Sequence, residues 1–137
     1  MNTKAERFVL DSSAIIALME DEDGADRVAE VLTQRNSILP YMVLLEVYYI
    51  SLRESSQADA DRRYVLMKQL PVKILWNTDE AILLTAGRFK AFHRISIADA
   101  VIAAYAKLYN AVLLHKDPEY EALADEIKLE NLPFKNL

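Results

Sequence analysis

With 137 residues, of which 53% are hydrophobic and 27% charged, the chain has the composition of a single folded globular domain. It contains no cysteine, which excludes disulfides and thiolate metal sites and suits a reducing cytoplasm. The formal net charge of −5 argues against a broad basic surface for nucleic acid, although bound divalent cations would cancel acidic charge where a phosphate backbone approaches.

Short apolar runs alternate with longer helical patterns along the chain. The runs predict four buried strands and a weaker edge strand, at residues 7–10, 37–39, 72–75, 111–114 and 127–129. Helical patterns lie between them at residues 13–20, 25–34, 42–53, 58–70, 79–92 and 97–109, and a short helix is expected after Pro118. This alternation predicts an α/β fold with a parallel sheet covered on both faces, in a single domain that spans residues 1–137.

No targeting or membrane-spanning segment is expected. The N-terminal residues MNTKAERF lack the apolar core of a signal peptide, and the apolar stretch at residues 41–52 is too short to cross a bilayer. We therefore expect a soluble cytoplasmic protein with no membrane partner. The same stretch is more apolar than one face of a small domain needs, which predicts an interface with a second subunit or another protein.

The scarcity of glycine excludes several enzyme classes. Gly24 and Gly87 are the only glycines, so the chain can form no G-x-G-x-x-G loop, Walker A loop or G-x-S-x-G elbow. The two histidines, His93 and His115, lack the spacing of a zinc site.

Four acidic residues occupy positions that are costly for an unpaired carboxylate. Asp11 follows the first strand and Asp117 follows the fourth, so both are expected at the carboxyl edge of the sheet, where ligands bind. Glu46 is the only charged residue in a long apolar segment, and burying its charge without a partner would cost several kcal/mol. Asp99 lies on an apolar helical face, but periodicity does not show whether its helix crosses that edge.

Each acid has a structural alternative. Asp11 and Asp117 can each cap the helix that follows, and Asp99 can form a capping box with Ser96. Glu46 can form a buried ion pair. Together, however, clustered carboxylates repel by roughly 4 kcal/mol per pair at about 4 Å, so a cluster requires cations. Ligands that are all oxygen favour Mg²⁺ or Mn²⁺, which catalyse phosphoryl chemistry.

The sequence blocks around these acids resemble those of the PIN-domain ribonucleases, and in particular VapC-type toxins of toxin–antitoxin pairs. The blocks are VLDSSA at residues 9–14, the apolar helix around Glu46, SIADAVIAA at 96–104 and LLHKD at 113–117. The resemblance covers essentially the whole chain. It implies a three-layer α/β/α fold and a Mg²⁺- or Mn²⁺-dependent endoribonuclease, with Asp11, Glu46, Asp99 and Asp117 as the catalytic and metal-binding residues. It also implies a homodimer, an RNA substrate and a small antitoxin.

One position departs from the family pattern. The family often has Thr or Ser two residues before its last acid, where this chain has His115. The substitution changes the hydrogen bonds available around Asp117.

A local excess of basic residues precedes Asp99. Residues 81–98 contain no acid but include Arg88, Lys90 and Arg94, which are candidate contacts to the RNA backbone. The alternative is that these cations only complement the end of a helix.

Two other classes of protein compete with a nuclease. A receiver-like phosphoacceptor domain needs adjacent acids after its first strand and an Asp at the end of its third. Here Asp11 stands alone and the third strand runs into Trp76 and Asn77, which disfavours that class. A non-catalytic PIN-like module for binding or assembly is disfavoured by the four intact acids.

Overall fold

The structure, a computed structural model, describes residues 6–133. Residues 1–5, most of the segment expected not to be a signal peptide, lie outside this range. The strands are β1 (Phe8–Leu10), β2 (Ser37–Pro40), β3 (Val72–Leu75), β4 (Val112–His115) and β5 (Lys128–Asn131). The helices are α1 (Ser12–Met19), α2 (Ala25–Thr33), α3 (Tyr41–Glu54), α4 (Gln57–Gln69), α5 (Glu80–Phe92), α6 (Ile97–Leu108) and the 3₁₀ helix η1 (Pro118–Leu123). Every strand and helix expected from the sequence is present, with ends that agree within about two residues.

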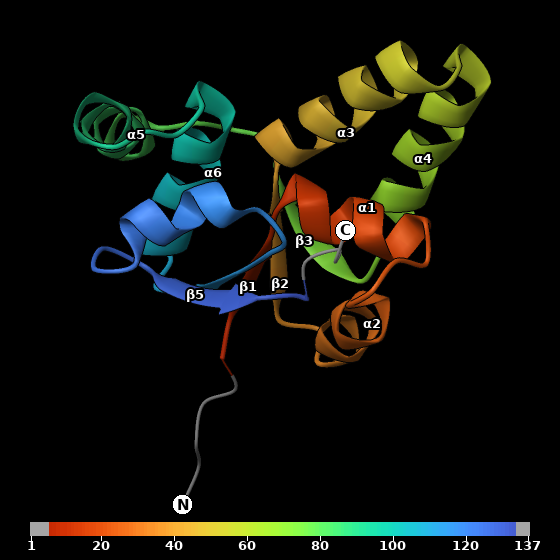
Figure 1. The fold of residues 1–137 in the computed structure, drawn as a ribbon, viewed down its shortest axis with the longest axis horizontal. Helices are drawn as coiled ribbons and strands as arrows, with labels where there is room; N and C mark the ends of the chain where they lie inside the picture. The colour runs from red at the N-terminus through yellow and green to blue at the C-terminus, as the bar shows by residue number, and fades with distance from the viewer. Residues whose placement is uncertain (1–5, 134–137) are drawn as a thin grey trace, which may run out of the picture.

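The strands form one parallel sheet in the order β3-β2-β1-β4-β5. Figure 1 shows α1 and α2 on one side of this sheet and α6, with α5 packed against it, on the other. The α3–α4 hairpin extends from the carboxyl end of β2. The predicted three-layer α/β/α fold is therefore confirmed.

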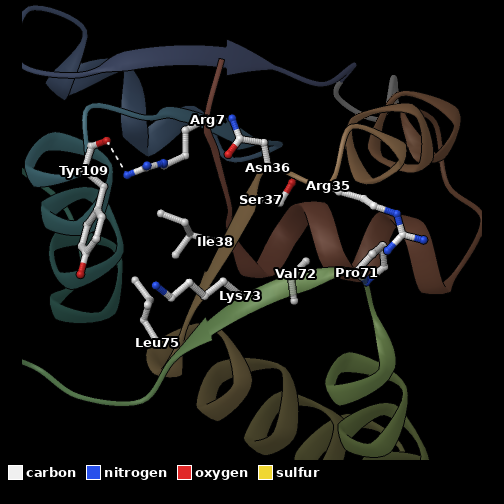
Figure 2. A pocket seen from close by; sticks show the side chains of 10 residues that line it. All are labelled: Arg7, Arg35, Asn36, Ser37, Ile38, Pro71, Val72, Lys73, Leu75 and Tyr109. Atoms are coloured by element: carbon white, nitrogen blue, oxygen red, sulfur yellow. Dashed lines mark hydrogen bonds between the residues drawn. The ribbon is translucent and has the colours of Figure 1, made fainter. Parts of the chain in front are cut away.

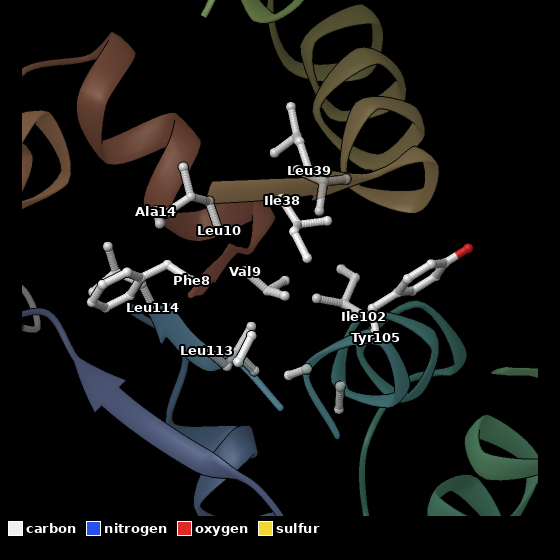
Figure 3. Packing of buried hydrophobic residues seen from close by; sticks show 14 of the residues in the cluster. Phe8, Val9, Leu10, Ala14, Ile38, Leu39, Ile102, Tyr105, Leu113 and Leu114 are labelled. Atoms are coloured by element: carbon white, nitrogen blue, oxygen red, sulfur yellow. The ribbon is translucent and has the colours of Figure 1, made fainter. Parts of the chain in front are cut away.

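The hydrophobic core lies on both faces of the sheet, because side chains alternate along each strand. In β1, Val9 lies toward Ile102 of α6, whereas the next residue, Leu10, lies toward Ala14 of α1 (Figure 3). All four side chains are fully buried. Strand β1 therefore lies at the centre of the core, and Asp11, the residue that follows it, is buried as well.

The sequence predicts residues 72–75 as a buried strand; the strand is present with these bounds, but its predicted burial is wrong. Strand β3 pairs only with β2, so it forms an edge of the sheet, and its residues are half-buried or, at Lys73, exposed. Its burial is incomplete because helix cover is concentrated over the central strands. The other edge is β5, as expected from the weaker pattern at its position.

Parallel strands bring the starts of three helices to one edge of the sheet. Helices α1, α3 and η1 begin immediately or shortly after β1, β2 and β4, so their first turns gather at the carboxyl edge. Within residues 6–133, no helix is long and apolar enough to cross a membrane.

Candidate metal centre

Asp11 lies between β1 and α1 and is 2% exposed. It caps α1, because its Oδ1 accepts a hydrogen bond from the Ala14 N–H at 2.9 Å. The Ser13 hydroxyl also donates to both carboxylate oxygens, at 2.7 and 2.9 Å. Despite these bonds, burial raises the pKa of Asp11 to about 7, and the charges of Asp117 and Glu46 add to the shift. The capping bonds therefore only partly offset the cost of burying the Asp11 charge.

Glu46 projects from the second turn of α3 and is half-buried. Its Oε1 accepts a hydrogen bond from the Ser12 hydroxyl at 2.6 Å. The buried ion pair that was its structural alternative is not formed with any of residues 6–133. Burial raises the pKa of Glu46, and the charge of Asp117 raises it further.

Asp99 lies in the first turn of α6 and is 6% exposed. One of the two hydrogen bonds of the predicted capping box is present: the Ser96 hydroxyl oxygen caps the helix by accepting from the Asp99 N–H at 3.1 Å. The Asp99 carboxylate, however, accepts from the Tyr120 hydroxyl at 2.9 Å. Burial raises the pKa of Asp99 to about 8, and a hydrogen bond with Glu119 favours its protonated form further.

Asp117 and Glu119 both belong to the turn that begins η1. Asp117 caps it, accepting from the Glu119 N–H at 2.9 Å. One carboxylate oxygen from each of these two residues and one from Asp99 lie within 4.8 Å of one another. Sequence reasoning missed Glu119, although the spacing Asp-Pro-Glu at the start of a turn could have indicated it.

His115, the departure from the family pattern, does not join the carboxylates. Its side chain is fully buried, and its Nδ1 accepts a hydrogen bond from the Asp117 N–H at 3.2 Å. Its Nε2 has no hydrogen-bond partner within the described part of the chain. Burial lowers the pKa of His115, so the ring is neutral and acts on the backbone of Asp117.

One carboxylate oxygen each of Asp99, Asp117 and Glu119 meet within 4.8 Å, whereas Asp11 and Glu46 lie outside that group but close enough for charge interactions with it. The charges of Glu46 and Asp117 each raise the pKa of both Asp11 and Asp99, and the main causes of these shifts include no basic side chain. The donors are all oxygens, so the residues present fit a hard divalent cation. Such an ion would supply the positive charge that the cluster lacks.

The three basic residues predicted to contact RNA differ in whether they already have partners within the protein. Arg88 lies 3.8 Å from a carboxylate oxygen of Glu126, and Lys90 donates to the Ile95 carbonyl at 2.7 Å. Arg94 is exposed, with no ion pair to any residue of the described part of the chain. It lies two residues before the cap of α6, next to the segment that carries Asp99.

A pocket of about 620 Å³ lies elsewhere, toward the amino ends of β2 and β3 (Figure 2). Its lining includes Arg7, Arg35 and Lys73, whereas none of the four acids lines it. The candidate site is therefore defined by the convergence of carboxylates and not by this cavity.

Comparison with known proteins gives one family and several similar folds. The model of the PIN domain family matches residues 8–126. No curated protein matches the chain. Similar solved structures include VapBC2 from Rickettsia felis bound to a promoter DNA fragment, with 17% identity, coverage of 92% of this chain and 98% of that one, and a TM-score of 0.74.

Two further structures are similar in fold. VapBC-1 from nontypeable Haemophilus influenzae has 24% identity, coverage of 90% and 96%, and a TM-score of 0.68. VapC20 from Mycobacterium tuberculosis, a toxin that cleaves the sarcin–ricin loop, has 16% identity, coverage of 88% and 95%, and a TM-score of 0.67. At these low identities the likeness concerns the fold.

Proposed function

The chain belongs to the PIN-domain family, and on that premise we propose that it is a divalent-metal-dependent endoribonuclease and the toxin of a VapC-type toxin–antitoxin pair. The observation that carries the proposal is the meeting of Asp99, Asp117 and Glu119 oxygens within 4.8 Å, with the charges of Asp11 and Glu46 close beside them. Such a cluster is unfavourable in an isolated protein and favourable around a cation.

In this proposal the four acids hold Mg²⁺ or Mn²⁺, which supplies an activated water and neutralises charge on the phosphodiester. The protein's own contribution is to hold the oxygens in place. Ser13 and the Ala14 N–H fix the Asp11 carboxylate, and the Ser12 hydroxyl fixes that of Glu46. Because these donors are already in position, little rearrangement is needed when the substrate binds.

We propose RNA as the substrate and Arg94 as a contact to its backbone. Two observations support this choice: Arg94 is exposed beside the Asp99 segment, and the structurally similar VapC20 is a toxin that cleaves the sarcin–ricin loop. Arg88 and Lys90 are engaged within the protein, so they contribute less in this proposal.

The proposed partners are a second copy of the chain and a small antitoxin. Leu45, Tyr49 and Leu52 of α3 are 51%, 41% and 39% exposed, which supports the interface predicted for this helix. A pocket of about 520 Å³ between α3 and α4 is also lined mainly by apolar and aromatic side chains, among them Trp76. Light scattering that finds only monomers at micromolar concentrations, with no partner bound, would count against this part of the proposal.

Incubation of the purified protein with total RNA tests the activity. We expect new RNA 5′ ends with Mg²⁺ or Mn²⁺ and none with a chelator, and we expect Asp11→Asn to abolish them. RNA binding without new ends under any metal would favour the alternative of a non-catalytic PIN-like module.

A further inference from the structure

We propose that Tyr120 is a positioning residue, which holds the Asp99 carboxylate in place for the cation. Its hydroxyl donates to Asp99 Oδ1 at 2.9 Å. Tyr120 is 0% exposed and Asp99 is 6% exposed, so water does not compete for this bond. With the cation bound, Asp99 would be charged, and a hydrogen bond to a charged acceptor is roughly twice as strong as one between neutral groups, so it would restrict rotation of the carboxylate. The inference rests on the proposed metal site.

The turn that carries Tyr120 is anchored by several contacts, which restrict the orientation of the Tyr120 ring. Pro118 occupies the first position of η1, directly after the cap. Tyr120 and Leu123 are three residues apart, which places them on the same side of a 3₁₀ helix, and both are fully buried. The Tyr120 ring also packs edge-on against His115, with 4.9 Å between ring centroids.

The hydroxyl joins two separate elements at the cluster. Asp99 comes from α6, whereas Asp117 and Glu119 come from the turn at the start of η1. The bond from Tyr120 links that turn to α6, so it sets the Asp99 oxygens relative to the other two acids. Loss of a group that orients a metal ligand typically weakens metal affinity or activity by about 10- to 100-fold.

The contacts of His115 with Tyr120 and with the backbone of Asp117 give this histidine a structural role. Its ring fills the space beside Tyr120, while its Nδ1 holds the Asp117 backbone. In this chain the hydroxyl that reaches a site carboxylate from this turn is that of Tyr120.

The test compares two tyrosine-to-phenylalanine variants of the full chain by titration with Mn²⁺, read from the spin-resonance signal of the free ion. Tyr120→Phe removes the hydroxyl and keeps the ring against His115, so we expect the Kd for Mn²⁺ to rise about 10-fold. The matched control is Tyr105→Phe. Tyr105 is 1% exposed and donates to the Asn77 carbonyl at 2.8 Å, away from the acids, so its variant should bind Mn²⁺ within about twofold of wild type.

A second arm asks whether Tyr120 acts through Asp99. In an Asp99→Ala background, Tyr120→Phe should leave the remaining Mn²⁺ affinity unchanged, because the group that it orients is gone. Wild-type Mn²⁺ affinity in Tyr120→Phe, an equal loss in Tyr105→Phe, or a further loss in the Asp99→Ala background would each overturn the assignment. A wild-type protein that binds no Mn²⁺ would overturn both the metal site and the role of Tyr120. Failure to cleave RNA with the Kd ratio intact would count against the nuclease alone.

Discussion

The hydroxyl of Ser12 donates to Glu46 Oε1 at 2.6 Å, although the two residues lie 34 positions apart. This bond joins the start of α1 to the second turn of α3. Because Asp11 directly precedes Ser12, the bond also brings Glu46 close to Asp11. The bond favours the charged form of Glu46, but burial outweighs it, and the pKa of Glu46 is raised. The cluster is therefore held together by polar contacts that only partly offset its desolvation and repulsion, and this imbalance has measurable consequences.

The first prediction concerns cleavage. Asp11→Asn keeps an oxygen that can cap α1 but removes the charge that a cation needs, so RNA cleavage with Mn²⁺ should fall by at least roughly 100-fold. The control is Asp79→Asn. Asp79 caps α5 through the Ile82 N–H at 2.9 Å, the same contact that Asp11 makes with Ala14, but it is not among the groups named as shifting the pKa of Asp11 or Asp99. Initial rates on a labelled RNA, with circular dichroism to verify the fold, check the result. An Asp11→Asn variant as active as the Asp79→Asn control would remove Asp11 from the site.

The second prediction concerns stability without metal. At pH 8.5, above its pKa of about 8, Asp99 is charged in the metal-free protein. Asp99→Asn then relieves repulsion in the cluster and can still accept from Tyr120, so its melting temperature in chelator at this pH should exceed that of wild type. Wild type should gain about 2.7 kcal/mol in metal at a hundredfold excess over Kd, and the variant should gain much less. If Asp99 only supported the start of α6, the variant would instead lose roughly 0.5–2 kcal/mol with an unchanged metal response. Thermal melts in chelator and in Mn²⁺ distinguish these outcomes.

The third prediction concerns pH. The pKa values of Asp11 and Asp99 are raised from 3.8 to about 7 and about 8 in the folded protein. The folded state therefore binds more protons than the unfolded chain between about pH 4 and pH 8, and its stability falls as pH rises through this window. We expect the metal-free protein to melt roughly 5 °C or more lower at pH 8.5 than at pH 5.5. Asp99→Asn should reduce this difference, and saturating Mn²⁺ should oppose it, because the cation binds the deprotonated acids. An equal fall in Asp99→Asn would assign the effect to other groups.

The fourth prediction concerns Glu119, which the sequence did not single out. Glu119→Gln removes one of the three acids whose oxygens lie within 4.8 Å, so Mn²⁺ affinity should fall about 10-fold. Glu121→Gln is the matched control, two residues further along η1. Glu121 accepts from Asn131 at 2.7 Å, and Gln can retain that bond. Calorimetric titration of both variants checks the comparison, and equal affinities would place Glu119 outside the metal site.

The fifth prediction concerns RNA binding. Arg94→Ala should raise KM several-fold and reduce its salt dependence, because an exposed cation beside the Asp99 segment is lost. Arg88→Ala should change KM less, since Arg88 is oriented toward Glu126. Cleavage rates at several salt concentrations separate the two variants. A larger increase of KM in Arg88→Ala than in Arg94→Ala would contradict the prediction and indicate that the RNA binds along α5.

The sequence by itself predicted the elements, and it placed three of the four proposed acids at the carboxyl edge of the sheet. Strand patterns placed Asp11 and Asp117 at strand ends, and the apolar segment isolated Glu46, because local periodicity and burial cost are properties of short stretches. That Asp11 and Asp117 also cap the helices that follow was among the alternatives that the sequence allowed, and both caps are present.

Only the tertiary structure decided how the fourth acid reaches the others. Two helices lie between β3 and β4, and α6, not α5, is the one that packs on the central strands. Small residues such as Ala103 on α6 are fully buried and allow close approach to the sheet, and that contact brings Asp99 to the carboxyl edge. Glu119 and Tyr120 were likewise beyond reach of the pattern, because their roles depend on long-range contacts between η1 and α6. Such contacts depend on how whole helices and strands pack together, and this packing cannot be read from the spacing of residues within a short segment.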